Sequence, residues 1–117
     1  MDNPIPRWRD LYIGSNHRRD FQVRQNNAAV NITGWSFKAD LLLSPDQAAT
    51  PLLALVASDF AILAPTTGDV RITFPTLTET NTGGRDQNRI FRLKAWLPGD
   101  VLTGPPREQL DFVVAVR

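Results

Sequence analysis

Residues 31–46 read NITGWSFKADLLLSPD, and this stretch decides the fold class. Asn31-Ile32-Thr33-Gly34 is a turn signal at its start, and Ser44-Pro45-Asp46 is a turn signal at its end. Between the turns, apolar residues alternate with mostly polar ones: Phe37, Ala39, Leu41 and Leu43 against Ser36, Lys38, Asp40 and Leu42. Alternation at every second position is typical of a strand with one buried face. We therefore predict a strand over 36–43, with the first set toward the core and Lys38 and Asp40 outward.

The same pattern recurs along the chain. It predicts strands over 10–13, 20–24, 29–32, 36–43, 69–74, 89–97 and 110–116, with 52–57 as a further strand or a helix because its apolar run is continuous. The expected inward residues are Phe21, Val23, Val70, Ile72, Phe74, Phe91, Leu93, Ala95, Leu97, Leu110, Phe112, Val114 and Val116. Nine Pro and seven Gly separate these segments, and a Pro inside a helix costs about 3 kcal/mol. The fold class expected is all-β: an immunoglobulin-like antiparallel β-sandwich of about seven or eight strands, without the cysteine pair of antibody domains.

The bulk composition is that of an ordinary globular protein. The chain has 117 residues, of which 42% are hydrophobic and 21% charged, and this length suits one domain. With no Cys, disulfides, thiolate metal sites and a Cys nucleophile are excluded. All basic residues except Lys38 and Lys94 are Arg. Arg is preferred for bidentate pairs at interfaces, although a GC-rich coding sequence would give the same bias.

No residue pattern indicates an enzyme, a cofactor or a metal site. His17 is the only histidine, and it stands beside Arg18 and Arg19 with no marked partner for a catalytic triad. One His without Cys does not make a zinc site. Asp40 and Asp111 fall within predicted strands, where cross-strand pairs with Arg or Lys are the simpler role. Gly83-Gly84-Arg85 lacks the frame of a phosphate-binding loop.

The charge pattern predicts neither a nucleic-acid nor a membrane partner. The net charge is +1, which gives no global attraction to nucleic acid. The only local basic clusters are Arg18-Arg19 and Arg7-Trp8-Arg9. The sequence contains no apolar run of the roughly 18 residues that a membrane span requires, and the first ten residues resemble no signal peptide. We therefore expect a protein that is soluble when made.

Three segments are candidates for contact with a partner protein. We predict an N-terminal arm over 1–9, before a domain over 10–117, in which Arg7, Trp8 and Arg9 reach a neighbour. Trp96 falls on the polar face of its strand, where it is either an exposed interface anchor or covered by a second sheet or a loop. Residues 76–88, TLTETNTGGRDQN, form a polar loop that is either a contact with a neighbouring subunit or a mobile surface loop. Its candidate contact residues, within 80–88, are Thr80, Asn81, Arg85 and Asp86.

The order of these elements resembles a family of small domains encoded among the tail genes of tailed bacteriophages. They are similar to the N-terminal immunoglobulin-like domain of upper baseplate proteins. The resemblance rests on Ile13-Gly14-Ser15-Asn16, on Asn31-Ile32-Thr33-Gly34, which is its sharpest piece, on the Thr-rich link 76–82, and on the alternating strands before and after them. A Leu-Pro-x-Gly-x-Tyr turn usual in that family is replaced here by the longer polar loop.

The resemblance implies a non-enzymatic virion structural protein, made in the host cytoplasm and present in the particle. It would be a tail, baseplate or fibre-attachment adaptor that binds other phage structural proteins in multiple symmetric copies. One alternative is a capsid decoration (cement) protein. Another is a carbohydrate-binding module, which would stack sugars on Trp8, Trp35 or Trp96.

Overall fold

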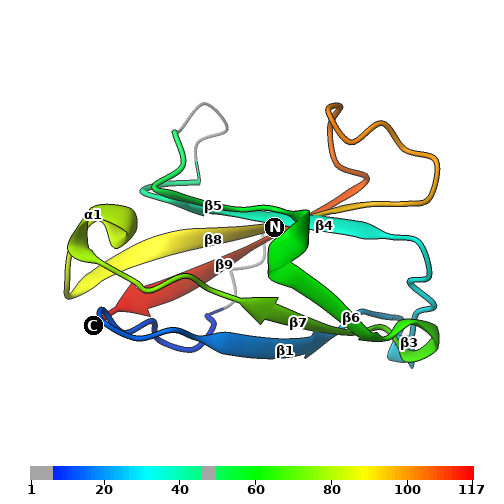
Figure 1. Ribbon diagram of the computed structural model, residues 1–117, viewed down its shortest axis with the longest axis horizontal. Coiled ribbons are helices and arrows are strands. Elements are labelled where there is room, and N and C mark those ends of the chain that lie inside the picture. The colour runs from blue at the N-terminus through cyan, green and yellow to red at the C-terminus, as the bar shows by residue number, and fades with distance from the viewer. Residues whose placement is uncertain (1–6, 46–49) are drawn as a thin grey trace.

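The protein is all-β in the computed structural model, which describes residues 7–45 and 50–117 (Figure 1). The described residues form nine strands: β1 Arg18–Gln22, β2 Arg24–Gln25, β3 Ala28–Ala29, β4 Ser36–Leu42, β5 Leu53–Leu55, β6 Phe60–Ala64, β7 Asp69–Thr73, β8 Gln87–Trp96 and β9 Glu108–Val116. Three single helical turns connect some of them: η1 Ala57–Asp59, η2 Pro65–Thr67 and α1 Glu79–Thr82. None of the described helices has the length and apolar character needed to cross a membrane.

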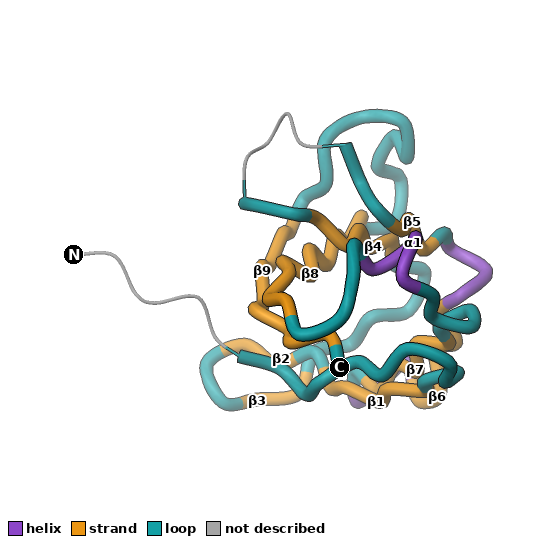
Figure 2. Tube along the Cα trace, turned by 90° about the vertical axis from the view of Figure 1, so that its left-hand side faces the viewer, coloured by secondary structure: helices purple, strands orange, loops and turns teal. Residues whose placement is uncertain are grey.

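The strands form three antiparallel sheets. One has the order β5-β4-β8-β9, the second has the order β1-β7-β6, and β2 and β3 form a small hairpin. The two larger sheets lie in separate layers, which the end-on view of Figure 2 shows clearly. This arrangement agrees with the all-β sandwich that the alternation predicts.

The core lies between the two larger sheets. Its main cluster combines Leu41, Phe91 and Val114 from one sheet with Ile72 and Phe74 from the other. A second cluster around Ile32, Phe37 and Val70 fills the end near the β2–β3 hairpin. Period-two alternation therefore selects most of the core correctly, because alternate side chains of a strand point to the same face.

The alternation is wrong at two strand ends. Leu43 was expected inward but is 58% exposed, whereas Leu42, in the alternate set of positions, is 2% exposed. β4 ends at Leu42, so the pleat no longer directs Leu43 toward the core. Leu110 was also expected in the core and is 59% exposed, although it belongs to β9.

Several elements differ from the sequence expectations. The predicted strand 20–24 is divided between β1 and β2, and of the predicted strand 29–32 only Ala29 lies in a strand, β3. The segment 10–13 is not a strand. Leu11 within it forms one isolated bridge with β9, and Arg7 before it forms another. The stretch 52–57 divides into β5 and the turn η1. β6 was not predicted, because its sequence FAILA has no alternation.

The outer face of the four-stranded sheet carries cross-strand ion pairs, as the sequence predicts for Asp40 and Asp111. Asp40 Oδ2 lies 2.6 Å from Lys94 Nζ, and Asp111 Oδ1 lies 2.8 Å from Arg92 Nε. Arg92 is only 5% exposed, and it also donates to the Pro45 carbonyl. These strand carboxylates thus have structural partners.

Candidate functional site

The predicted arm is attached to the domain from Arg7 onward. Its first six residues lie outside the described part of the chain. Trp8 N–H donates to the Val113 carbonyl at 2.8 Å, Leu11 N–H to Ala115 at 2.8 Å, and Ile13 N–H to Arg117 at 2.9 Å. Arg117 N–H donates back to the Leu11 carbonyl at 2.8 Å. Residues 7–13 therefore cover the outer edge of the last part of β9, and we call Val113, Ala115 and Arg117 the closed edge.

Trp8 packs on the protein's own core, where the sequence predicted contact with a neighbour. Its ring centroid lies 5.1 Å from that of Phe91 and 5.4 Å from that of Phe112. The guanidinium of Arg19 lies 5.4 Å from the Trp8 ring centroid. Arg19 is 6% exposed and donates to the carbonyls of Arg9 and Asp10. This buried cation fastens the N-terminal segment to β1, while Arg7 and Arg9 stay exposed.

Residues 76–88, predicted as a polar loop, are held by side-chain hydrogen bonds from within the segment and from Arg89. Thr78 caps α1 through a reciprocal pair of bonds: its hydroxyl accepts from Asn81 N–H at 3.1 Å, and its N–H donates to Asn81 Oδ1 at 2.8 Å. At the other end, buried Arg89 donates from Nε to the Thr82 carbonyl and from Nη2 to the Gly83 carbonyl. Gly83 has φ 78°, and a Cβ there would lie 2.8 Å from Arg89 Nε. Asn81 is thus a capping residue.

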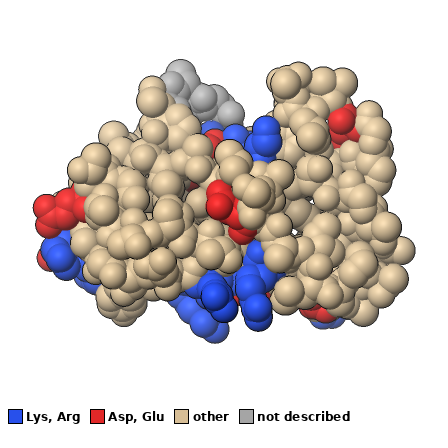
Figure 3. All heavy atoms as spheres, viewed as in Figure 1, with Lys and Arg blue, Asp and Glu red and all other residues tan. Residues whose placement is uncertain are grey.

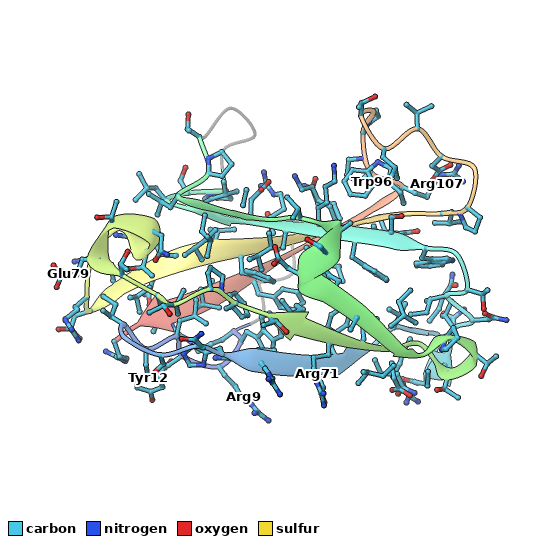
Figure 4. All side chains as sticks on the ribbon, in the orientation of Figure 1. Arg9, Tyr12, Arg71, Glu79, Trp96 and Arg107 are labelled. Carbon is cyan, nitrogen blue, oxygen red and sulfur yellow. The ribbon has the colours of Figure 1, made fainter. Side chains whose placement is uncertain are left out.

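The other predicted contact residues of this segment are exposed. Thr80 lies on the surface of α1. Arg85 Nε lies 3.3 Å from Oε1 of Glu79, and Figure 4 shows Glu79 at one end of the molecule. Asp86 has φ 58° and lies 3.7 Å from Arg117. Their role in binding remains a prediction.

Of the two interpretations of Trp96, the exposed interface anchor is wrong. Trp96 is 3% exposed, because the loop 97–107 lies against it. Its Nε1 donates to the Gly104 carbonyl at 3.2 Å, and Lys38 Nζ lies 5.4 Å from the ring centroid. Figure 4 shows Trp96 directed toward this loop, on the side of the molecule opposite to Arg9 and Arg71. Of the two interpretations of its position on the polar face, the covering loop is confirmed.

The first part of β9 has a free edge in the described structure. The backbone N–H and C=O groups of successive residues point to opposite sides of a strand. Those of Val113, Ala115 and Arg117 point away from β8. The backbone groups of Gln109 and Asp111 therefore point away from β8 as well. No described residue makes a backbone hydrogen bond to these outward groups. We call Gln109 and Asp111 the open edge.

An apolar groove of about 480 Å³ runs beside the open edge. Its lining joins side chains of β9 and β1 with those around the β2–β3 hairpin: Trp8, Phe21, Val23, Val30, Trp35, Phe37, Leu93, Ala95, Leu110 and Phe112, with polar Gln22, Arg24, Gln25, Glu108 and Gln109. β9 and β2 lie on the same side of the molecule in Figure 2. The sequence assigned most of the apolar residues to the core, and it held no local signal that this side of the core is accessible.

A second surface feature is a group of arginines on the outer face of the three-stranded sheet. Arg9, Arg18 and Arg71 line a shallow hollow with Asp20, and Figure 3 shows basic atoms gathered along this lower side. Arg71 Nε lies 2.8 Å from Asp20 Oδ1. The hydrogen bond from Arg71 lowers the pKa of the Asp20 carboxyl.

His17 has a structural environment. Its Nε2 accepts a hydrogen bond from Tyr12 N–H at 3.0 Å, and its ring lies edge-on to Phe74. Burial lowers the pKa of the imidazole, and the positive charge of Arg19 lowers it further. Across the described ranges 7–45 and 50–117, no group of three His, Asp or Glu side chains is placed to hold a metal ion.

Comparison of the sequence with protein-family models and with curated proteins found no match.

Proposed function

We propose that this protein is a non-enzymatic virion structural subunit of a tailed bacteriophage, which acts by binding neighbouring structural proteins in the tail or baseplate or at a fibre attachment. The observation that carries the proposal is the apolar groove beside the open edge of β9. An accessible strand edge beside apolar side chains is a surface suited to another polypeptide. Multiple symmetric copies would then convert modest contacts into a stable particle.

The strand order supports the immunoglobulin-like form of this proposal. A three-stranded and a four-stranded antiparallel sheet pack around one core, with sequence-distant strands as neighbours. Immunoglobulin-like sandwiches combine sheets of these sizes in the same manner. The turn Asn31-Ile32-Thr33-Gly34, which carries the resemblance, leads into the central strand β4.

The capsid cement protein is the alternative within the particle, and the copy number separates the two roles. We would count this chain in purified particles from its source by quantitative mass spectrometry. A small multiple of three or six supports a tail or baseplate subunit. Hundreds of copies per particle would make it a cement protein, and complete absence from particles would refute the virion role.

The environments of the three tryptophans argue against the carbohydrate-binding alternative. Trp96 is buried, and Trp8 is in contact with Phe91, Phe112 and Arg19. Trp35 is half-buried, with its ring 6.2 Å from that of Phe37. Sugar binding requires an exposed ring face, and none of these side chains is fully exposed.

A further inference from the structure

We propose that the open edge of β9 and the groove beside it bind an extended segment of a neighbouring protein, which adds to the sheet as a further strand. The segment would carry apolar side chains at alternate positions, directed into the groove. This inference deepens the proposed function and rests on it, because it names the kind of partner segment that the subunit binds.

The first argument is that the same edge already binds an extended segment. Residues 7–13 hydrogen-bond to Val113, Ala115 and Arg117 through backbone groups, and Asp10 adds an ion pair with Arg117 Nε at 3.4 Å. β9 continues from Val113 back to Glu108 with unbroken pairing to β8. The open edge is therefore a direct continuation of a surface that accepts a strand, and its outward groups have the same spacing.

The second argument is that the chain's own N-terminal sequence is poorly suited to extend this pairing. Trp8 N–H donates to the Val113 carbonyl, and in a parallel pair the next donors toward Asp111 and Gln109 would stand two and four residues earlier. Those positions are Pro6 and Pro4. Proline has no N–H, so neither position can donate to the carbonyls of the open edge. A segment from another protein can supply these donors.

The third argument is the composition of the groove. Aromatic and aliphatic side chains line it, including Phe21, Trp35 and Phe112. Leu110 is 59% exposed at the groove although its strand position faces the sandwich interior. The volume of about 480 Å³ falls in the range of roughly 300–1,000 Å³ typical of ligand pockets. Apolar side chains from an added strand would remove this surface from water.

The charges beside the groove also favour a largely uncharged segment. Arg24 and Glu108 are its charged lining residues and have opposite signs. Asp111 is paired with Arg92 on the outer face of the sheet. The open edge carries neither a Lys, a Pro nor a register shift, which are devices that commonly protect exposed edges.

The first test is amide hydrogen exchange in the free, full-length protein. We expect the N–H groups of Gln109 and Asp111 to exchange rapidly, and those of Leu110 and Phe112, which point toward β8, to be protected. Protection of Gln109 and Asp111 in the free monomer would overturn the proposal, because the edge would already be occupied.

The second test uses random linear nine-residue peptides selected on the full-length protein. We expect binders with apolar residues at alternate positions, and their binding should protect the Gln109 and Asp111 amides from exchange. Gln109→Pro removes one outward donor and Leu110→Lys places a charge in the groove, so each should weaken binding at least tenfold. Val101→Lys is the matched control: Val101 is a 70% exposed aliphatic residue outside the groove, and its substitution should leave binding unchanged.

Two results would overturn the strand-binding proposal. One is a selection that yields no peptide binding the wild type better than the Leu110→Lys variant. The other is binders that perturb amides elsewhere and tolerate both edge substitutions. If either result were found while particles contained a small multiple of three or six copies of this chain, strand addition would be refuted and the proposed virion role would stand. Absence from particles would refute that role whatever the peptides do.

Discussion

The closed and open edges of β9 belong to the same strand but differ in what stabilises them. The closed edge is covered by residues 7–13. This segment is held in place by a hydrogen bond from Arg19 to the Arg9 carbonyl and by the side chain of Leu11, which is buried in the core. The open edge has the same outward backbone groups without a described partner, and its nearest large side chain, Leu110, is mostly exposed. Hydrogen-bonding capacity alone does not decide whether an edge is covered. The covering segment also needs donors and a buried side chain to hold it there.

Truncation of one leucine at each edge should give the largest contrast. Leu11 is 1% exposed and Leu110 is 59% exposed. We expect Leu11→Ala to lower the free energy of unfolding by about 2–5 kcal/mol, because it leaves a cavity in the core. Leu110→Ala should change it by less than about 0.5 kcal/mol. Urea denaturation measures both, and equal losses would contradict the distinction between the edges.

Removal of the Arg19 guanidinium should give the next largest effect. Arg19→Met keeps an apolar stem near Trp8 but deletes the bonds to the Arg9 and Asp10 carbonyls. Loss of such charged hydrogen bonds should cost about 1.5–3 kcal/mol, measured by urea denaturation. Arg18→Met is the matched control, since Arg18 is the exposed neighbour on β1, and it should change stability by less than about 0.5 kcal/mol. A control as destabilised as Arg19→Met would show that Arg19 does not fasten the segment.

A proline pair tests which way the backbone of the open edge points. Leu110→Pro removes an N–H directed toward β8 and leaves a buried acceptor, at a cost of about 1–3 kcal/mol from that loss alone. Gln109→Pro removes an outward N–H, and proline is tolerated at such edge positions. Thermal unfolding should therefore rank Leu110→Pro as clearly less stable than Gln109→Pro. The reverse ranking would mean that the assigned direction is wrong.

The smallest effect should come from acidification. Burial lowers the pKa of His17 below its ordinary value of 6.5, so the unfolded chain binds a proton more readily than the folded one. The resulting stabilisation is fully present above pH 6.5 and is lost as the pH falls toward the folded pKa. Because His17 supports Tyr12 in the segment next to the closed edge, that segment should loosen first.

The control for acidification is His17→Gln, which retains a side-chain acceptor for Tyr12 N–H and removes the titrating imidazole. Chemical denaturation at pH 7 and pH 5 should give a smaller decrease for this variant than for the wild type. If both proteins lose the same stability between these pH values, His17 does not contribute to the decrease.

The sequence predicts much of the sheet structure because strand alternation is a local property. It places β4, β7, β8 and β9 within a few residues and assigns Asp40 and Asp111 to cross-strand pairs. It misses β6, whose apolar residues do not alternate. It does not decide whether Trp96 is exposed or covered, because the covering residues belong to the loop after the strand and not to the strand itself.

The candidate site was less predictable, for a different physical reason. The polar segment 76–88 carries a detectable signal, since Thr78 and Asn81 have the spacing of a reciprocal helix cap. The open edge has no such local signal, because it results from the absence of a spatial neighbour among residues 7–45 and 50–117. The only related feature of the sequence is the pair of prolines at positions 4 and 6, which lack backbone N–H donors. That this lack concerns the open edge is recognisable only once the register of Trp8 against Val113 is known.

The pairing of residues 7–13 with residues 113–117 also has a consequence for synthesis of the chain. These are nearly the first and the last of the described residues to leave the ribosome. Contacts between such distant segments have a high entropic cost of loop closure and form late in folding. The closed edge therefore forms only after the end of β9 has emerged, and until then the nascent chain presents apolar Trp8 and Leu11 without the strand that covers them.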